Sequence, residues 1–260
     1  MLRIALGLGV VAIGFWIWRR QSVRKGLGFT FHGWMFGDFG AWALIALIAM
    51  AGIFVVEWVT GGIQVVGFSL DLNSMGRDAG WFIFGAFFEE FIFRSLILSG
   101  LVALFLGRKW PAIIISAALF GYAHLNNPNA SYITAFGNAL GGLMYGIAFL
   151  GGKNIWLPVG LHFGWNFFQG PIFGFPVSGL TYQSLIGQET TGSDLLTGGA
   201  YGPEAGLVGM TFRFVVIALL LYYLHRRCSR QGEIKSLTFP IKVYDNSPRL
   251  DRKTTLQESF

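Results

Sequence analysis

Apolar residues along this chain form long blocks that are separated by short polar connections. Seven blocks are long enough, or nearly so, to cross a hydrocarbon core ~30 Å thick at ~1.5 Å of rise per helical residue. These blocks cover residues 2–18, 41–59, 81–106, 111–127, 131–150, 155–173 and 206–224. The pattern predicts an all-α, polytopic membrane protein with about seven transmembrane helices.

The composition supports a membrane protein. Of the 260 residues, 53% are hydrophobic and only 12% are charged, whereas a soluble domain carries roughly 25% charged residues. A surface so poor in polar groups has to be covered by lipid. We expect a single transmembrane domain over residues 1–225 and a polar cytoplasmic tail over 226–260. The first block is followed by WRRQSVRK without a cleavage pattern, so we expect it to be retained as a span.

The basic residues predict an orientation. If the connection after the first block is cytoplasmic, most of the 19 lysines and arginines fall on that side. The long connection over residues 174–205 lies on the other side and contains neither lysine nor arginine. By the positive-inside rule, the N-terminus is outside and the C-terminus inside. Because most of the basic residues lie in the connections on one side of the membrane, the net charge of +6 does not indicate a nucleic-acid partner.

Three ionisable residues interrupt the third block, in FFEEFIFRSLIL (87–98). Such groups are costly in a bilayer and usually face the interior of a helix bundle. Glu90 and Arg94 are four residues apart, so on a helix they share a face and can neutralise each other. Glu89 has Phe93 at that spacing and therefore no local cation, which leaves its carboxylate available as a general base or acid. The alternative is that all three residues have a structural role only and hold helices together through interhelical contacts.

Two further blocks carry polar groups at a similar depth. His124 lies in LFGYAHLNN, and His162 and Asn166 share a helix face in LHFGWN. Helix rise and the predicted orientation put these groups and Glu89 within a slab of about 10 Å near mid-membrane. The alternative roles are an interfacial histidine at 124 and interhelical hydrogen bonds at 162 and 166.

Two other charged residues within predicted spans are interpreted as structural. Glu57 lies near the outer end of its span. Arg213 lies at a comparable depth in the last span, where it could pair with Glu57 or with Glu204. The single cysteine, Cys228, excludes an intrachain disulfide and a multi-cysteine metal site.

The three polar clusters, in this order, resemble the signature of the CPBP family, which comprises CAAX proteases and bacteriocin-processing enzymes and is also called Abi. The family includes the type II CAAX prenyl endopeptidases of eukaryotes. Its pattern is EExxxR, FxxxH and HxxxN, and this chain has EEFIFR (89–94), FGYAH (120–124) and HFGWN (162–166). The resemblance covers about residues 81–172, and it implies intramembrane peptide hydrolysis.

Residue by residue, the resemblance implies that Glu89 is the general base and that His124 holds and activates the water. His162 and Asn166 would stabilise the oxyanion, and the ion pair between Glu90 and Arg94 would support the site. The family is often described as metalloproteases, and zinc held by Glu89, His124 and His162 is the alternative cofactor. Because the chain has no HExxH and asparagine is a poor zinc ligand, we expect no metal.

The expected partners are the lipid bilayer and a peptide or membrane-associated protein substrate. The short connections and compact layout suggest a prokaryotic plasma membrane. Two non-hydrolytic functions remain as alternatives: a bacteriocin-immunity protein that binds its target, and a proton-coupled transporter in which the same carboxylate and histidines relay protons.

Overall fold

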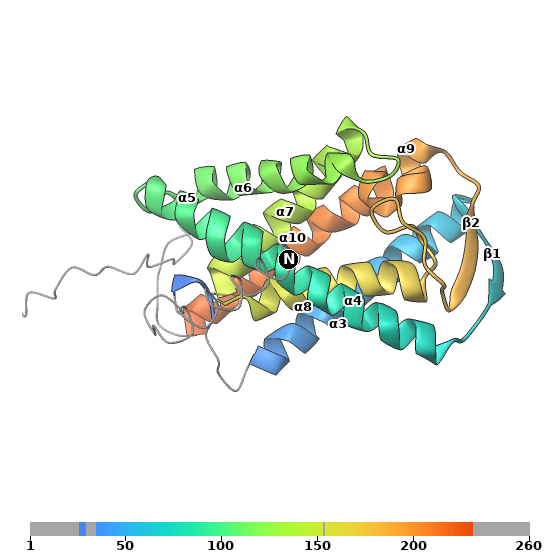
Figure 1. Ribbon diagram of the computed structural model, residues 1–260, viewed down its shortest axis with the longest axis horizontal. Coiled ribbons are helices and arrows are strands. Elements are labelled where there is room, and N and C mark those ends of the chain that lie inside the picture. The colour runs from blue at the N-terminus through green and yellow to red at the C-terminus, as the bar shows by residue number, and fades with distance from the viewer. Residues whose placement is uncertain (1–25, 30–34, 153, 231–260) are drawn as a thin grey trace, which may run out of the picture.

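The computed structural model describes residues 26–29, 35–152 and 154–230, and these are mostly helical. Figure 1 shows the long helices running side by side along the longest axis of the molecule. They are α3 (Met35–Val59), α4 (Leu72–Glu90), α6 (Lys109–Ala123), α7 (Tyr132–Gly152), α8 (Trp156–Phe167) and α10 (Leu207–Arg230). The predicted first span, 2–18, and residues 231–260 of the predicted tail 226–260 lie outside the described residues, whereas 226–230 belong to α10.

Among the described residues, three helices are long and apolar enough to cross a membrane. They are α3, α7 and the part of α10 from Leu207 to Arg226. The predicted span 41–59 begins earlier, at Met35. The predicted span 81–106 is a continuous run of α4, a π-helix η1 (Phe91–Leu98) and α5 (Ser99–Leu104), and it begins at Leu72.

The early start of α4 has a local cause. Asp71 precedes the helix in an extended conformation, and its Oδ1 accepts hydrogen bonds from the backbone N–H groups of Asn73 and Ser74 at 3.0 and 3.1 Å. This N-cap satisfies two N–H groups that have no partner within the helix. The helix can therefore begin in a polar stretch that a hydropathy pattern does not recognise.

The π-helix η1 begins directly after Glu90 and contains Arg94. A π-helix closes i→i+5 hydrogen bonds, so its turns are wider than those of an α-helix, and it is often found at functional sites. A second π-helix, η3 (Phe168–Ile172), follows α8 and contains Pro171. The predicted span 155–173 is thus α8 with η3 added to its end.

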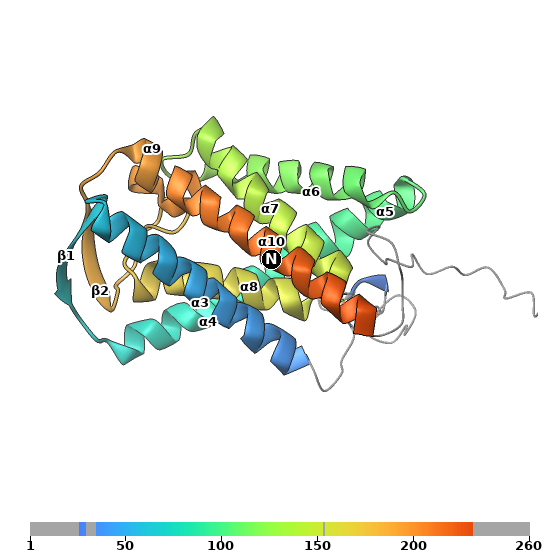
Figure 2. The same cartoon turned by 180° about the vertical axis from the view of Figure 1, so that it is seen from behind.

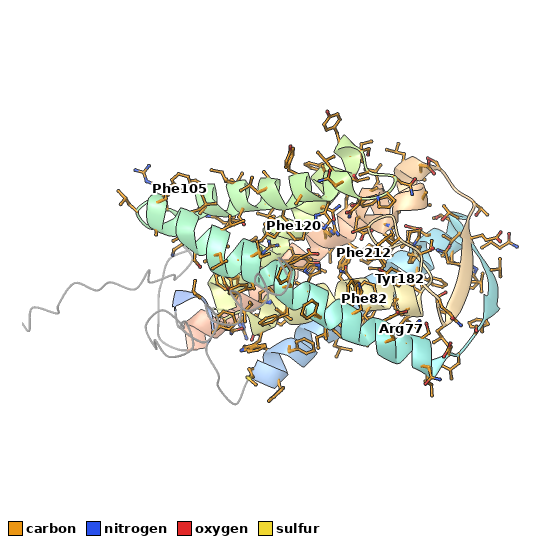
Figure 3. The ribbon with its side chains drawn as sticks, in the orientation of Figure 1. Arg77, Phe82, Phe105, Phe120, Tyr182 and Phe212 are labelled. Carbon is orange, nitrogen blue, oxygen red and sulfur yellow. The ribbon has the colours of Figure 1, made fainter. Side chains whose placement is uncertain are left out.

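Glycines allow α7 to pack closely against its neighbours. A Cβ added at Gly142 would lie 2.9 Å from Ala117 Cα on α6, and one added at Gly121 of α6 would lie 2.2 Å from the Ala135 carbonyl oxygen on α7. Only glycine permits this approach of the two backbones, as is common for helices within membranes. Figure 3 shows Phe82, Phe120 and Tyr182 in the middle of the molecule, with Phe105 at the end away from the sheet.

The all-α prediction omits a small antiparallel sheet. Strand β1 (Ile63–Phe68) follows α3, and strand β2 (Ile186–Thr190) lies in the connection between α8 and α10. The register pairs Ile63 with Thr190 and is irregular between Val65 and Gly67. Figure 2 shows the sheet capping one end of the bundle, near the short helix α9 (Asp194–Thr197). The strands are too short and too far apart in sequence for either to be recognised from its own residues.

Candidate active site

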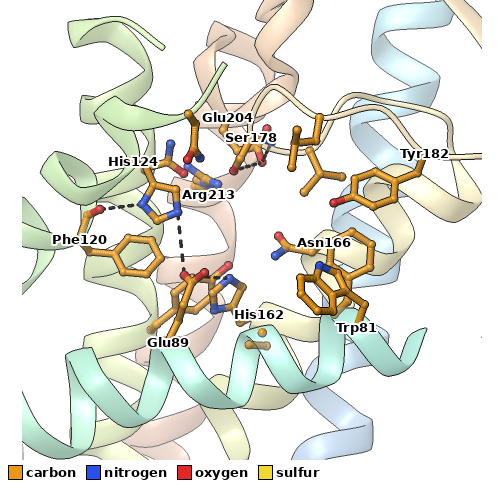
Figure 4. Close-up of a pocket in the computed structure, with 18 residues that line it drawn as sticks. Trp81, Glu89, Phe120, His124, His162, Asn166, Ser178, Tyr182, Glu204 and Arg213 are labelled. Carbon is orange, nitrogen blue, oxygen red and sulfur yellow. Dashed lines mark hydrogen bonds and ion pairs between the residues drawn. The ribbon is translucent and has the colours of Figure 1, made fainter. Parts of the chain in front are cut away.

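A cavity of about 210 Å³ lies among the helices that carry the three motifs. Glu89 reaches it from α4, His124 from the end of α6, and His162 and Asn166 from α8. Figure 4 shows all four side chains around the cavity. The structure thus brings together the four residues that the sequence predicted as catalytic.

One wall of the site is a buried network around Glu90. Arg94 Nε lies 2.9 Å from Glu90 Oε2, and both side chains are fully buried. The second oxygen, Oε1, lies 2.9 Å from His162 Nδ1. Arg94 Nη2 also donates to the Gly142 carbonyl at 3.4 Å, and its guanidinium lies 4.6 Å from the centroid of the Phe120 ring. The predicted ion pair is present, and it additionally orients His162.

Glu89 faces both histidines. Its Oε2 lies 3.9 Å from His124 Nε2 and 4.0 Å from His162 Nε2, and its side chain is 38% exposed. Among the described residues, this oxygen is buried without a hydrogen-bond partner. The carboxylate oxygen therefore lies near two imidazole nitrogens but beyond direct hydrogen-bond distance of each.

The partners of the two Nδ1 atoms assign the ring tautomers. His124 Nδ1 lies 2.7 Å from the Phe120 carbonyl oxygen, and His162 Nδ1 lies 2.9 Å from Glu90 Oε1. Because a carbonyl or carboxylate oxygen only accepts, each Nδ1 carries a proton and donates it. In a neutral ring this leaves the lone pair on Nε2, which is the atom that faces Glu89.

Aromatic packing fixes the ring of His162. Tyr145 of α7 stacks on it with centroids 4.5 Å apart and an interplanar angle of 13°. The Phe120 ring packs against it in a T-shaped arrangement with centroids 5.9 Å apart. A stacked ring and a bonded Nδ1 together leave the imidazole one orientation. Tyr145 is therefore a residue of the site that the motifs do not contain.

The spacing around Glu89 differs from that of a zinc site. Ligand atoms at 2.0–2.1 Å from a tetrahedral zinc ion are ~3.4 Å apart. The 3.9 and 4.0 Å separations exceed this, and no group of three His, Cys, Asp or Glu side chains among the described residues forms a metal-binding cluster. The same separations suit a water molecule at ordinary hydrogen-bond distance from Glu89 and from a histidine. These residues as arranged do not fit zinc.

The cavity also has a wall that the sequence interpretation missed. Arg213 of α10 and Glu204 line it together with Ser178 and Asn138. Glu204 lies in η5 (Pro203–Ala205), a one-turn helix before α10. Among the described residues, Arg213 forms no direct ion pair with Glu57 or Glu204, but its charge acts on Glu204 and lowers the pKa of that carboxyl. Arg213 donates instead to the Gly137 carbonyl. The sequence indicated only that Arg213 is a charged residue within a span. It could not show which residues surround Arg213, because these come from distant parts of the chain.

Glu204 holds the connection between α8 and α10 onto the bundle. Its Oε2 accepts from Gln169 Nε2 at 2.6 Å, and its Oε1 accepts from the backbone N–H of Ser178 at 3.2 Å. Gln169 also donates to the Pro176 carbonyl at 2.6 Å. Burial raises the pKa of Glu204, and Arg213 opposes this rise. The connection after α8 is thereby fastened over the cavity.

Comparison with known proteins relates the motif-bearing segment to one family. Residues 77–168 match the family described as Type II CAAX prenyl endopeptidase Rce1-like, and this segment contains all three motifs. No curated protein and no solved structure matches the chain. The ordered motifs and the cavity where they meet agree with this match, which covers less than half of the chain and supports an assignment to the CAAX protease, or CPBP, family. The apolar helices indicate a membrane protein.

Proposed function

We propose that this protein is an intramembrane endopeptidase that attacks a peptide bond with a water molecule activated by Glu89 and His124. One observation carries the proposal: a carboxylate without a paired cation faces the Nε2 atoms of two histidines in a cavity. A water between Glu89 and His124 could give one hydrogen bond to the carboxylate and the other to the lone pair on His124 Nε2.

The reaction follows from general acid–base chemistry. Glu89 takes a proton from the water as its oxygen attacks the carbonyl carbon of the substrate. The carbonyl oxygen becomes an oxyanion, which Asn166 Nδ2–H and a protonated His162 Nε2–H can stabilise. When the tetrahedral intermediate collapses, the C–N bond breaks and the proton on Glu89 passes to the leaving nitrogen. The products are a carboxylate end and a free amine.

The two histidines differ in what holds their Nδ1–H group, and this suggests different roles. Glu90, an anion, accepts the bond from His162 and can stabilise positive charge on that ring, as the aspartate does in a serine protease triad. A neutral backbone carbonyl accepts the bond from His124. His162 is therefore suited to donating to the oxyanion, and His124 to accepting from the water.

The proposed setting is the plasma membrane of a prokaryote, with about seven spans, the N-terminus outside and the C-terminus inside. The substrate is a peptide or a membrane-associated protein. Support comes from the apolar helices and from the distribution of basic residues. A reporter that is active only in the cytoplasm, fused after Phe260, should be active; an inactive fusion in a folded protein contradicts this orientation.

A substitution series tests the chemistry. Glu89→Gln, His124→Ala and His162→Ala should each lower peptide cleavage by ~10²–10⁴-fold, because each removes a group used in proton transfer or charge stabilisation. Glu189→Gln is the matched control, since this carboxylate lies exposed on β2. Products would be identified by mass spectrometry from purified protein in lipid vesicles, with insertion checked for every variant.

Two outcomes would contradict the proposal. Cleavage that survives Glu89→Gln excludes Glu89 as the base. Immunity or proton-driven transport that survives all three substitutions would assign the physiological role to a non-hydrolytic activity. Treatment with a chelator tests whether the enzyme needs a metal. Activity that is lost on chelation and restored by zinc would overturn the metal-free mechanism.

A further inference from the structure

A glycine lines the cavity on the same helix as the proposed base. Gly85 belongs to α4 and lies one turn before Glu89, and both residues line the cavity. Glycine is less favourable than alanine inside a helix, so close packing or a positive φ commonly explains its presence. Neither explains Gly85. Its backbone is helical, and among the described residues an added Cβ would meet no atom within 4 Å beyond its own helix turn.

Open space alone does not distinguish Gly85 from the other glycines of α4. A Cβ added at Gly80 would likewise meet no atom within 4 Å among the described residues. Gly80 is exposed, however, and does not line the cavity, whereas Gly85 is half-buried and does. The space that Gly85 leaves empty is therefore part of the cavity that contains Glu89.

Gly85 is the middle member of a row along α4. Trp81, Gly85 and Glu89 are four residues apart and all line the cavity, so they share a helix face at steps of ~6 Å. Trp81 is 65% exposed, whereas Glu89 Oε2 is buried. Figure 4 shows Trp81 and Glu89 on either side of the cavity. The row therefore leads from an exposed aromatic ring to the proposed reacting groups.

Other side chains enclose the space beside this row. Leu180 and Tyr182 line the cavity from the connection after α8, and the Tyr182 ring packs against Phe82 of α4 with centroids 4.8 Å apart. Asn166 of α8 lines the cavity as well, and Figure 4 shows it near Trp81 and Tyr182. A peptide that reaches Glu89 from the Trp81 end has to pass over Gly85, where α4 has no side chain.

We propose that Gly85 is a specificity-determining residue, and that the space above it is the subsite for a bulky apolar side chain of the substrate. This inference rests on the proposed peptidase function, because it places the scissile bond at Glu89. An extended peptide advances ~3.3 Å per residue, so the ~6 Å from Gly85 to Glu89 corresponds to about two residues. The subsite then holds a residue about two positions from the bond that is cut.

The size of the cavity makes this position sensitive to substitution. Its volume of about 210 Å³ is below the ~300–1,000 Å³ of sites that enclose drug-sized ligands. A leucine side chain at position 85 would occupy much of this space and displace the substrate's own side chain. Alanine would fill less of it, so the effect should grow with the size of the residue at 85.

The first experiment measures the size preference of cleavage. An apolar peptide that the unsubstituted protein cuts is varied to glycine, leucine or phenylalanine at each position within three residues of the scissile bond. At one position, Gly85→Leu should lower the phenylalanine-to-glycine ratio of kcat/KM by at least ~10-fold, and Gly85→Ala should lower it less. Gly80→Leu, on the same helix but outside the cavity, is the matched control and should keep the ratio.

Stability distinguishes a subsite from a packing role. Gly85→Ala and Gly80→Ala should both leave the unfolding temperature unchanged or raise it by ~1–4 °C, since alanine favours helix and each Cβ meets open space. A fall in Gly85→Ala alone would make Gly85 a packing residue and overturn the proposal. A size preference that is the same in Gly85→Leu as in the unsubstituted protein would also overturn it.

A binding measurement separates this inference from the proposed catalysis. In the Glu89→Gln background, an apolar tripeptide with a central phenylalanine should raise the unfolding temperature more than one with a central glycine. Adding Gly85→Leu should remove this difference. If both results hold while the unsubstituted protein cleaves no peptide, the peptidase proposal fails and the Gly85 subsite stands. If the two tripeptides bind alike in Glu89→Gln, the Gly85 proposal is overturned.

Discussion

Arg94 and Arg213 are two buried arginines in similar surroundings that differ in one respect. Each donates to a backbone carbonyl of α7, at Gly142 and Gly137 respectively, and each lies against aromatic rings. Arg94 has the Glu90 carboxylate at 2.9 Å, whereas no carboxylate of the described residues pairs with Arg213. The difference shows that burial of a charge does not by itself reveal how it is compensated: Glu90 contacts Arg94 directly, whereas Arg213 and Glu204 interact without a direct ion pair.

The largest expected loss of stability follows from replacing Arg94. Arg94→Met leaves Glu90 fully buried with only His162 beside it, and breaking a buried ion pair in this way costs about 3–5 kcal/mol. Arg213→Met leaves the Gly137 carbonyl without its donor, which costs about 1–3 kcal/mol. Thermal unfolding of purified protein in one detergent would measure both. An equal loss for the two variants would mean that Arg213 is as structural as Arg94.

The second prediction tests whether the loss of stability in Arg94→Met comes from the unpaired Glu90 carboxylate. In the double variant Glu90→Gln/Arg94→Met, both charges are removed and the glutamine oxygen can still accept from His162 Nδ1. Replacement of a whole buried pair is often nearly neutral, so stability should recover most of what Arg94→Met alone loses. Unfolding temperatures of the two single variants and the double variant form a mutant cycle. Additive losses would contradict a direct pair.

The smallest expected effect concerns the close packing beside Arg94. Gly142→Ala should destabilise by about 1–3 kcal/mol through overpacking, since its Cβ would press on Ala117 of α6. Gly146→Ala is the matched control one turn along α7, where the nearest atom to the added Cβ lies at an ordinary 3.4 Å. The control should be neutral or slightly stabilising because alanine favours helix more than glycine does. Unfolding temperatures that rank the two variants in the opposite order would contradict this packing.

Features that depend on a single helix could be predicted from the sequence. The ion pair between Glu90 and Arg94 follows from a spacing of four residues, and the structure contains it even though η1 widens the turns after Glu90. The lack of a cation beside Glu89 follows from the same reasoning. The sheet of β1 and β2 could not be predicted, because each strand is stabilised by a partner more than a hundred residues away in the chain.

The sequence by itself determined which segments are apolar, which charges lie within them and which of those charges share one helix face. Local helix geometry is sufficient for each of these. The tertiary structure alone decided that Glu90 also binds His162, which fixes the proton of that ring on Nδ1, and that Arg213 reaches the cavity beside Glu204. These outcomes depend on how helices are rotated and how deeply they are placed relative to one another, and packing between distant segments sets both.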